Sequence, residues 1–569
     1  MTVEAPAVRT ERIDLGDGLI MRWSTAADKD DIGELMAEGF RYRALNRTIP
    51  KGYKPLRHDF IRAATRRVMS GHSAVMDPTD FAVVEDTNAK TGELRLVAGI
   101  GLQRLPGYYG KTDLQYGIGE LVASLPKYRN RGLVRRLFTD MIHPASEARG
   151  DVIQLVFGIP HFYLQFGYIQ AIRTREYVLF NNYDFIPKLA EGKKEPFTLR
   201  TPTRADLPFL LKMSTREAQN CPADIGFHYD ETYWLYTAFE TIEKAESYHD
   251  GDRISRIVVD RKSGEDVGLV IFSASAGLFW HLFTLNESPE RGITYRETMF
   301  PILRQVLDQA REQWNGPLDK LRLELKTELE ADEQRRQASD DPEVKFAPVI
   351  HPLLEYGTDR ASRLAFFLHP SHPVRQICKA NQYSTQVFPG YRGYVRINSY
   401  PRFLNKVAPT LEDRLAKSPM AGLSATLHVG FYRITEGASA KGLKLCFIRG
   451  KLIAAEDWAE PSDEAQVQLD RAAVLAADKK KKAKETRQQT NGNGEIKEDG
   501  TEGEEDEEEP LQLKAYFPPL VLSRLVLGEL SFEQLKLAYE DSFAIGNDCK
   551  MLLAILFPVA DHNADNFWW

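Results

Sequence analysis

Residues 121–134 have the sequence LVASLPKYRNRGLV, in which an apolar stretch gives way to a basic one. The stretch Leu121-Val122-Ala123-Ser124-Leu125 is short and partly β-branched, which predicts a strand, and Pro126 ends it because proline has no N–H for a ladder. A helix is predicted to begin near Asn130, because apolar residues recur after it at helical spacing: Leu133, Leu137, Met141 and Ile142.

The turn between strand and helix has the chemistry of an anion site. The first backbone N–H groups of a helix have no partner within it, and Arg129, Arg131 and Arg135 place positive charge beside them. Gly132 lets an anion approach the backbone without meeting a Cβ. A second strand, Val152–Phe157, gives a β-α-β order that favours a nucleotide-like ligand at the end of the first strand.

The elements upstream follow a definite order. Leu19–Trp23 is predicted to be a strand, and Asp28–Phe40 an amphipathic helix with Thr25 as its cap. Phe81–Val84 and Leu96–Gly101 are predicted to form a hairpin across a turn-rich segment.

This order of strand, helix, hairpin, strand, loop, helix and strand resembles the GCN5-related N-acetyltransferase superfamily. Its acetyl-CoA loop, Arg/Gln-x-x-Gly-x-Gly/Ala, is matched by Arg129-x-x-Gly132-x-Val134, where valine departs from the pattern. Residues 158–168, GIPHFYLQFGY, are similar to the late motif that carries a tyrosine beside the cofactor thiol, here Tyr163. Gly158 stands where the family often has a serine, so that contact is absent or supplied by another residue.

The resemblance implies acetyl transfer from acetyl-CoA, as co-substrate, to a primary amine. Tyr163 would be the general acid, against the alternative of a packing role, and the carboxylate of Trp569 the base, with Glu120 as the second candidate. The implied cofactor-binding residues are Val122, Ala123, Ser124, Arg129, Asn130, Arg131, Gly132, Leu133, Val134 and Arg135. The rival hypothesis is a non-catalytic acyl-CoA or lipid-binding scaffold.

The predicted class is α/β (α+β), with two tandem acetyltransferase-type mixed sheets and flanking helices. The catalytic domain is expected at 1–190. A second copy at 191–392 is degenerate, because Glu290–Thr294 lacks the paired basic and small residues of the loop. Residues 393–569, from Tyr394–Ile397 onward, resemble the sterol-carrier-protein-like α/β domain of enhanced-intracellular-survival type acetyltransferases. A charged segment at about 470–510 has too few apolar residues to fold and is predicted to be a disordered insertion.

Composition restricts the remaining classes. The formal charge of −7 over 569 residues owes much to Glu502–Glu509, so no basic surface for nucleic acid is indicated. Four scattered cysteines and unclustered histidines predict no metal site, and no apolar stretch approaches the roughly 20 residues of a membrane span. We expect a cytoplasmic protein, with nuclear import through Lys479–Lys484 left open. Its partner would be a small-molecule or peptide amine, and a homo-oligomer is compatible with the sequence.

Overall fold

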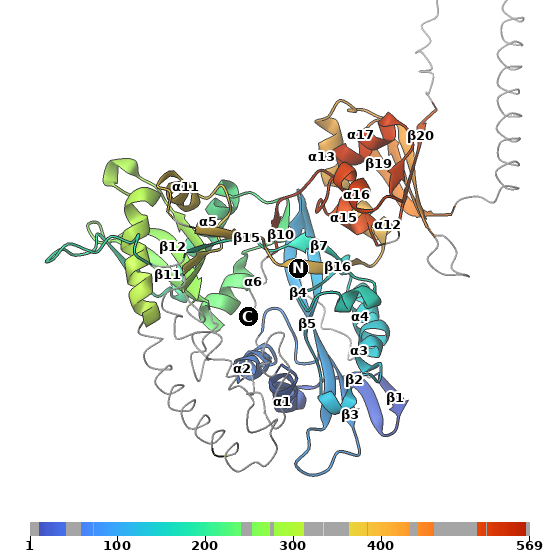
Figure 1. The fold of residues 1–569 in the computed structure, drawn as a ribbon, viewed down its shortest axis with the longest axis horizontal. Helices are drawn as coiled ribbons and strands as arrows, with labels where there is room; N and C mark the ends of the chain where they lie inside the picture. The colour runs from blue at the N-terminus through green and yellow to red at the C-terminus, as the bar shows by residue number, and fades with distance from the viewer. Residues whose placement is uncertain are drawn as a thin grey trace, which may run out of the picture. The chain divides into compact units, whose positions relative to one another are not determined.

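The computed structural model describes residues 11–40, 59–71, 73–180, 183–240, 253–273, 278–311, 334, 364–383, 385–432, 442–459, 509–518 and 520–564. They divide into two compact units. The first contains residues 1–398 together with 560–569, and the second contains residues 399–559 (Figure 1). Mixed sheets with flanking helices confirm the α/β class predicted from the sequence.

The first unit contains two sheets. The first sheet, in spatial order, comprises β1 (Arg12–Gly16), β2 (Leu19–Trp23), β3 (Phe81–Asp86), β4 (Leu96–Tyr109), β5 (Thr112–Ser124), β6 (Ile153–Val156), β16 (Arg392–Ile397) and β7 (Ile169–Arg173). β10 (Ile225–Phe227) pairs with β4, and β22 (His562–Asn563) pairs with β10. The predicted strand 19–23 and the predicted hairpin are confirmed, and β4 and β5 extend well beyond the hairpin that the sequence suggested.

Helices cover both faces of the first sheet (Figure 1). They are η1 (Ala26–Asp28), α1 (Lys29–Gly39), α2 (Asp59–Val68), η2 (Pro126–Tyr128), α3 (Leu133–Arg136), the π-helical turn η3 (Leu137–Ile142), α4 (His143–Ala148) and η4 (Phe162–Phe166). β5 and β6 run parallel, so the chain needs a crossover between them, and α3, η3 and α4 supply it. Leu137 and Phe138 on this crossover are fully buried in the core against the sheet.

Two details of the predicted strand-to-helix segment were wrong. The strand predicted at 121–125 is the end of the 13-residue β5, which stops at Ser124. The helix begins at Leu133 rather than near Asn130, because Asn130 and Gly132 both have left-handed backbone angles that interrupt a helix.

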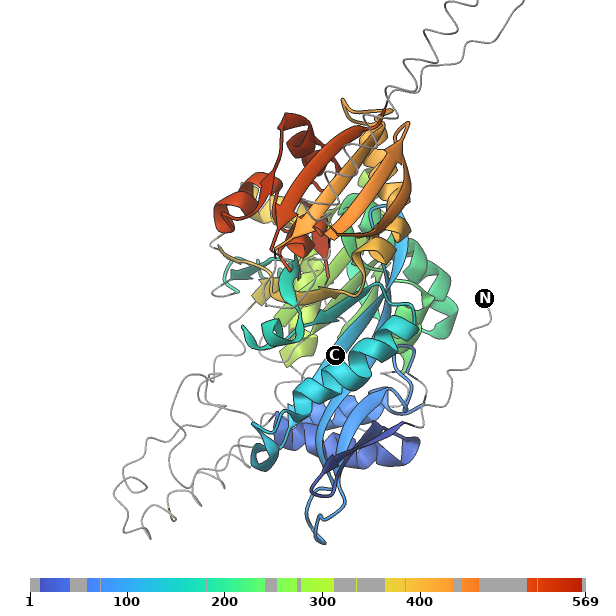
Figure 2. The same ribbon diagram turned by 90° about the vertical axis from the view of Figure 1, so that its right-hand side faces the viewer.

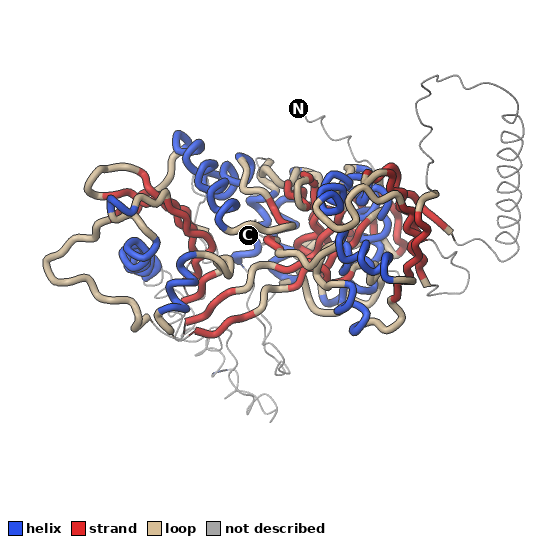
Figure 3. The backbone as a smooth tube through the Cα atoms, turned by 90° about the horizontal axis from the view of Figure 1, so that it is seen from above, coloured by secondary structure: helices blue, strands red, loops and turns tan. Residues whose placement is uncertain are grey.

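The second sheet has the order β15 (Thr385–Phe388), β8 (Tyr177–Phe180), β14 (Leu364–Phe366), β13 (Leu278–Leu285), β12 (Asp266–Ser273), β11 (Ile254–Asp260) and β9 (Phe197–Arg200). Its described helices are η5 (Arg204–Asp206), α5 (Leu207–Asn220), α6 (Glu231–Trp234), η6 (Leu235–Glu240), η7 (Pro289–Arg291), α11 (Pro373–Ala380) and a helix over 295–311. Figure 3 shows the strands in red with helices in blue on either side of them.

The first unit has two halves, one built on each sheet, and each half contributes one strand to the sheet of the other. β8 follows β7 along the chain but joins the second sheet, where it pairs with β14 and β15. Conversely, β16 follows the strands of the second sheet along the chain but lies between β6 and β7 of the first sheet. The assignment of Tyr394–Ile397 to the third domain was therefore wrong, since these residues complete the first sheet.

The second unit contains one five-stranded sheet, with β20 parallel to β17 (Figure 2). Its strands, in spatial order, are β19 (Lys451–Trp458), β18 (Gly442–Ile448), β17 (Ala425–Phe431), β20 (Leu511–Phe517) and β21 (Phe543–Ala544). Its helices are α12 (Tyr400–Lys406), α13 (Ala408–Ala416), α15 (Leu522–Val526), α16 (Phe532–Ala538) and α17 (Asn547–Leu556). The predicted insertion lies outside the described residues except for Glu509 and Pro510. None of the helices in the described ranges combines the length and the apolar character that crossing a membrane requires.

Candidate active site

The predicted anion loop leads from the end of β5 into α3. It passes through η2 and then through two left-handed residues, Asn130 (φ 61°) and Gly132 (φ 74°). A Cβ on Gly132 would meet no atom within 4 Å, so the loop is open there, as expected, and glycine also serves the left-handed backbone. Arg136 N–H donates to the Gly132 carbonyl at 3.1 Å, so the N–H groups of the preceding residues lie at the helix start, where an anion can accept them.

The arginines of the loop have different roles. Arg129 Nε donates to the Ser124 carbonyl at 3.2 Å, which closes the loop back onto the end of β5. Arg135 donates to the Gln165 carbonyl at 2.9 Å and to its Oε1 at 2.7 Å. Because Gln165 lies on η4, Arg135 connects the loop helix directly to the segment that carries Tyr163. Arg131 is exposed, with a 3.3 Å ion pair to the exposed Asp17, so its charge stays available near the loop.

The edge of β5 beside β6 opens before the loop begins. β5 and β6 pair only at Tyr116–Ile118, whereas β5 continues to Ser124 alongside β4 alone. A bulge interrupts the β4–β5 register at this point, and Leu121 there has φ 54°. N–H groups alternate in direction along a strand, so some of those in Val122–Ser124 point away from β4 and toward this open edge.

Tyr163 lies on η4 and is almost fully buried, at 5% exposure. Phe138 contacts its ring edge-on, with 6.0 Å between centroids. Its ring also lies directly over Gly158, where an added Cβ would come within 2.3 Å of Cε2. The missing serine at this position therefore has a physical cause, because the space that a side chain would need is filled by Tyr163.

The electrostatic environment keeps the Tyr163 phenol protonated. Burial raises its pKa above the ordinary value of a tyrosine, and Glu120, Tyr391 and Tyr394 raise it further. Glu120 is itself buried, at 6% exposure, on β5. Glu120, the second candidate for the base, is therefore a buried residue of the first sheet and one of the groups that raise the pKa of the Tyr163 phenol.

The third candidate, Trp569, lies outside the described residues. The chain before it is described as far as Ala564, and it returns to the first unit at β22, next to β10. Asp224 and Asp561 fix this return, since Asp224 N–H donates to the Asp561 carbonyl at 2.8 Å and Asp561 N–H donates to the Asp224 carboxylate at 2.9 Å.

Sequence reasoning missed Tyr391 and Tyr394, which enter the site from the second half. The Tyr394 hydroxyl accepts the His161 N–H at 2.6 Å, and the Tyr391 hydroxyl donates to the Gly158 carbonyl. No local pattern could have found them, because both lie more than 200 residues from their partners and reach the site only through the strand exchange.

The second half repeats the first in several contacts. Thr203 and Asp206 form the capping box that Thr25 and Asp28 form in the first half. Arg200 pairs with Asp206 at 2.7 Å, and Arg22 pairs with Asp28 at 2.9 Å.

The turns before the two helices also correspond. Arg291, at the end of η7, binds Asp260 at the end of β11, and Tyr128, at the end of η2, binds Asp86 at the end of β3. However, Gly292 follows Arg291 directly, whereas three residues separate Tyr128 from Gly132.

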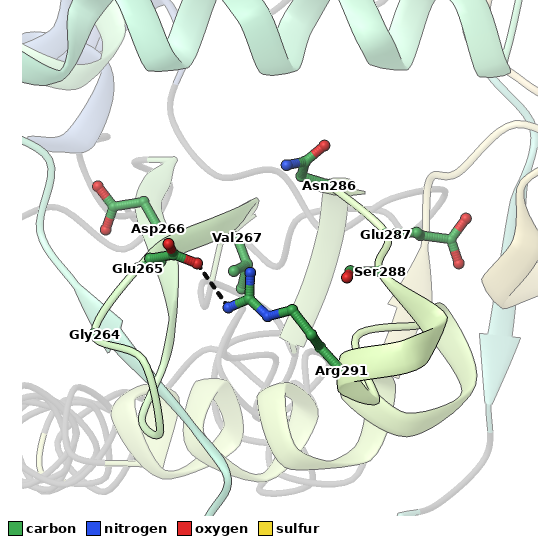
Figure 4. Close-up of a pocket in the computed structure, with 8 residues that line it drawn as sticks. All are labelled: Gly264, Glu265, Asp266, Val267, Asn286, Glu287, Ser288 and Arg291. Atoms are coloured by element: carbon green, nitrogen blue, oxygen red, sulfur yellow. Dashed lines mark ion pairs between the residues drawn. The ribbon is translucent and has the colours of Figure 1, made fainter.

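The shorter turn leaves an acidic pocket where the first half has its anion loop. The pocket has a volume of about 680 Å³ and is lined by Gly264, Glu265, Asp266, Val267, Asn286, Glu287, Ser288 and Arg291 (Figure 4). Its single arginine is paired with Glu265 at 2.7 Å. Two of its three carboxylates are paired, Glu265 with Arg291 and Asp266 with Arg200, so both arginines are already bound to carboxylates. In the residues that the structure describes, no cluster of metal-ligating side chains occurs.

Comparison with known proteins gives likenesses of fold. No protein-family model matches the chain, and no curated protein matches it in sequence. A conserved protein of unknown function from Enterococcus faecalis, named a probable N-acyltransferase, has a TM-score of 0.50 and 13% identity, with 95% of this chain and 97% of that chain covered.

Two other solved structures score lower. A GCN5-related N-acetyltransferase from Anabaena variabilis has a TM-score of 0.49 and 11% identity, with 95% and 97% covered. Eis1 from Mycobacterium abscessus has a TM-score of 0.45 and 10% identity, with 96% and 98% covered. Of the three, the Enterococcus structure alone reaches 0.50, and at that identity the likeness concerns the fold.

Proposed function

We propose that the chain transfers an acetyl group from acetyl-CoA to a primary amine. The observation that carries the proposal is the position of Tyr163, which is buried on η4 and is joined through Gln165 and Arg135 to the predicted anion loop. A loop with free N–H groups and a buried phenol joined to it suit a ligand that carries both a pyrophosphate and a thioester.

The loop would hold the pyrophosphate with the N–H groups of Gly132, Leu133 and Val134 and with the charge of Arg131. N–H groups of Val122–Ser124 that point away from β4 would donate to the thioester oxygen and stabilise the negative charge that develops on it. The amine nitrogen then bonds to the thioester carbon, and the carbon–sulfur bond breaks. Tyr163 donates its proton to the departing sulfur. Because the phenol is a weaker acid than a free thiol of pKa about 8.5, this transfer is uphill, and the phenolate has to recover a proton from solvent before the next turnover.

The acceptor ammonium must lose a proton before it attacks. Two carboxylates are candidates for this role, Glu120 on β5 and the terminal carboxylate of Trp569. The pairing of β22 with β10 supports Trp569, since it fixes the chain on the first unit only six residues earlier. The buried position of Glu120 on β5 and its effect on the pKa of the Tyr163 phenol support the other candidate. Turnover of Glu120→Gln and of a chain lacking Trp568 and Trp569 separates them, because only loss of the true base raises the pH at which turnover reaches half its maximum.

We further propose that the second unit is sterol-carrier-like, on the support of its five-stranded sheet with helices and its place after two acetyltransferase-type halves. A small-molecule or peptide amine is the proposed acceptor, and the cytoplasm, where acetyl-CoA is made available, is the proposed compartment.

Calorimetry of acetyl-CoA binding tests the loop. Gly132→Asp should raise Kd at least about fivefold, because two like charges 4 Å apart repel by about 1 kcal/mol in water and about 4 kcal/mol near a protein surface. Gly132→Asn is the matched control, since asparagine tolerates the left-handed backbone and carries no charge. Gly292→Asp, at φ 72° in the second half, controls for the location. Equal affinity in Gly132→Asp and the parent chain would remove the cofactor site from this loop.

A further inference from the structure

The loop of residues 158–161, which connects β6 to the Tyr163 segment, has little support of its own. Ile159 is 62% exposed, and Pro160 and His161 are exposed as well. His161 has a left-handed backbone (φ 65°) without being glycine, so the turn is strained and needs outside contacts to persist.

Two tyrosines from the second half of the unit provide such contacts at both ends of the loop. At its start, the Tyr391 hydroxyl donates to the Gly158 carbonyl. At its end, the Tyr394 hydroxyl accepts the His161 N–H at 2.6 Å. The ring of Tyr394 also lies beside that of Tyr163, with 5.5 Å between centroids. We call Tyr391 and Tyr394 the tyrosine pair.

The backbone that carries the pair is itself fixed against the first sheet. Tyr391 N–H donates to the Thr174 hydroxyl at 2.7 Å, and Thr174 N–H donates to the Tyr391 carbonyl at 2.9 Å. Gly390 approaches so closely that an added Cβ would lie 1.8 Å from the Thr174 carbonyl oxygen. Tyr394 lies within β16, between β6 and β7. The backbone at both tyrosines is therefore hydrogen-bonded to the first sheet, with Tyr394 buried and Tyr391 50% exposed.

We propose that Tyr391 and Tyr394 are positioning residues, which hold the loop of residues 158–161 at both ends and thereby fix the Tyr163 phenol where the reaction needs it. The proposal rests on the function proposed above. It gives the second half, whose own loop is predicted to be degenerate, a direct part in the reaction of the first.

The test uses Tyr391→Phe, Tyr394→Phe and the double variant in the full chain, since each keeps its ring and loses only a hydroxyl. Tyr177→Phe is the matched control. Its ring is stacked between Phe367 and Phe388 at 4.7 and 5.1 Å, and among the described residues its hydroxyl makes no hydrogen bond. Hydrogen exchange of the peptide that covers residues 158–166 reports on the loop, and steady-state kinetics with acetyl-CoA report on Tyr163.

We expect exchange of this peptide to become about three- to tenfold faster in each tyrosine-pair variant, the effect of one lost hydrogen bond, and to stay at the parental rate in Tyr177→Phe. The kcat should fall by about the same factor, whereas KM for acetyl-CoA stays within about twofold. The double variant should lose less than the product of the single effects, because both hydroxyls hold one loop.

Unchanged exchange in both single variants would overturn the proposal whatever the kinetics show. Faster exchange with parental kcat would overturn the positioning role, since the loop would then move without consequence for Tyr163. A parent chain that binds acetyl-CoA but transfers no acetyl group defeats the proposed function itself, and the positioning role with it, whereas the exchange rates still decide whether the tyrosine pair holds the loop.

Discussion

Gly158→Ala perturbs the site with one methyl group. The new Cβ would lie 2.3 Å from Tyr163 Cε2, 2.8 Å from Cζ and 2.7 Å from the hydroxyl oxygen. Ordinary contact between carbon atoms is about 3.5 Å, so the ring or the loop has to move by about 1.2 Å. Gly158 does not have a positive φ, so alanine adds no backbone strain. Any loss of activity or stability in Gly158→Ala would therefore come from the contact between the new methyl group and the Tyr163 ring.

A displacement of about 1 Å at a catalytic group costs about 10²-fold in rate, so we expect kcat to fall by about that factor. Overpacking should lower the free energy of unfolding by about 1–3 kcal/mol. The assays are steady-state acetyl transfer and urea unfolding. Tyr163→Ala removes the ring, so Gly158→Ala made on that background should change stability by less than about 0.5 kcal/mol. A Gly158→Ala chain with parental kcat and parental stability would refute the placement of Tyr163 over Gly158.

Three further predictions follow from the same contacts. Tyr163→Phe should lower kcat by about 10²–10⁴-fold while calorimetry shows unchanged acetyl-CoA affinity, and parental kcat in this variant would reduce Tyr163 to a packing residue. In the parent chain, kcat should not decline as the pH passes 10, because the pKa of Tyr163 is raised. Burial lowers the pKa of His372 to about 4 and of His143 to about 3, so below pH 6.5 the unfolded chain binds more protons than the folded one, and the free energy of unfolding should fall by about 1.4 kcal/mol per pH unit for each histidine between pH 6.5 and 4. In His372→Gln the thermal midpoint should depend less steeply on pH over this range, and an unchanged dependence would exclude His372 as a cause. Replacing residues 470–510 by a short Gly/Ser linker should leave the thermal midpoint within a few degrees, because a segment of that composition adds no core and loop length costs little entropy; a loss of many degrees would mean that it is structured.

Local patterns were sufficient for much of the first sheet. Strand β2, the Thr25 cap and the hairpin of β3 and β4 depend on neighbours in sequence, and so does the repeat of the same cap at Thr203. Gly132 and Tyr163 could be singled out for the same reason, since a strand-to-helix turn and a short aromatic segment have local signatures.

The remainder depends on pairing over long distances. β16 inserts between β6 and β7 from more than 200 residues away, and its alternating residues would suit any sheet. Tyr391 and Tyr394 were therefore invisible as site residues, and Tyr394 was assigned to the wrong domain. The burial of Glu120 was likewise undecidable, because it depends on which elements cover β5.

Release of CoA from acetyl-CoA, measured with the parent chain and a panel of primary amines, tests the central claim most directly. The account predicts release that requires both acetyl-CoA and an amine, with the acetylated amine detected by mass spectrometry in equal amount and with Tyr163→Phe at least about 10²-fold slower. Acetyl-CoA binding by calorimetry without amine-dependent release, for small-molecule and peptide amines alike, would contradict it and favour a non-catalytic acyl-CoA-binding scaffold.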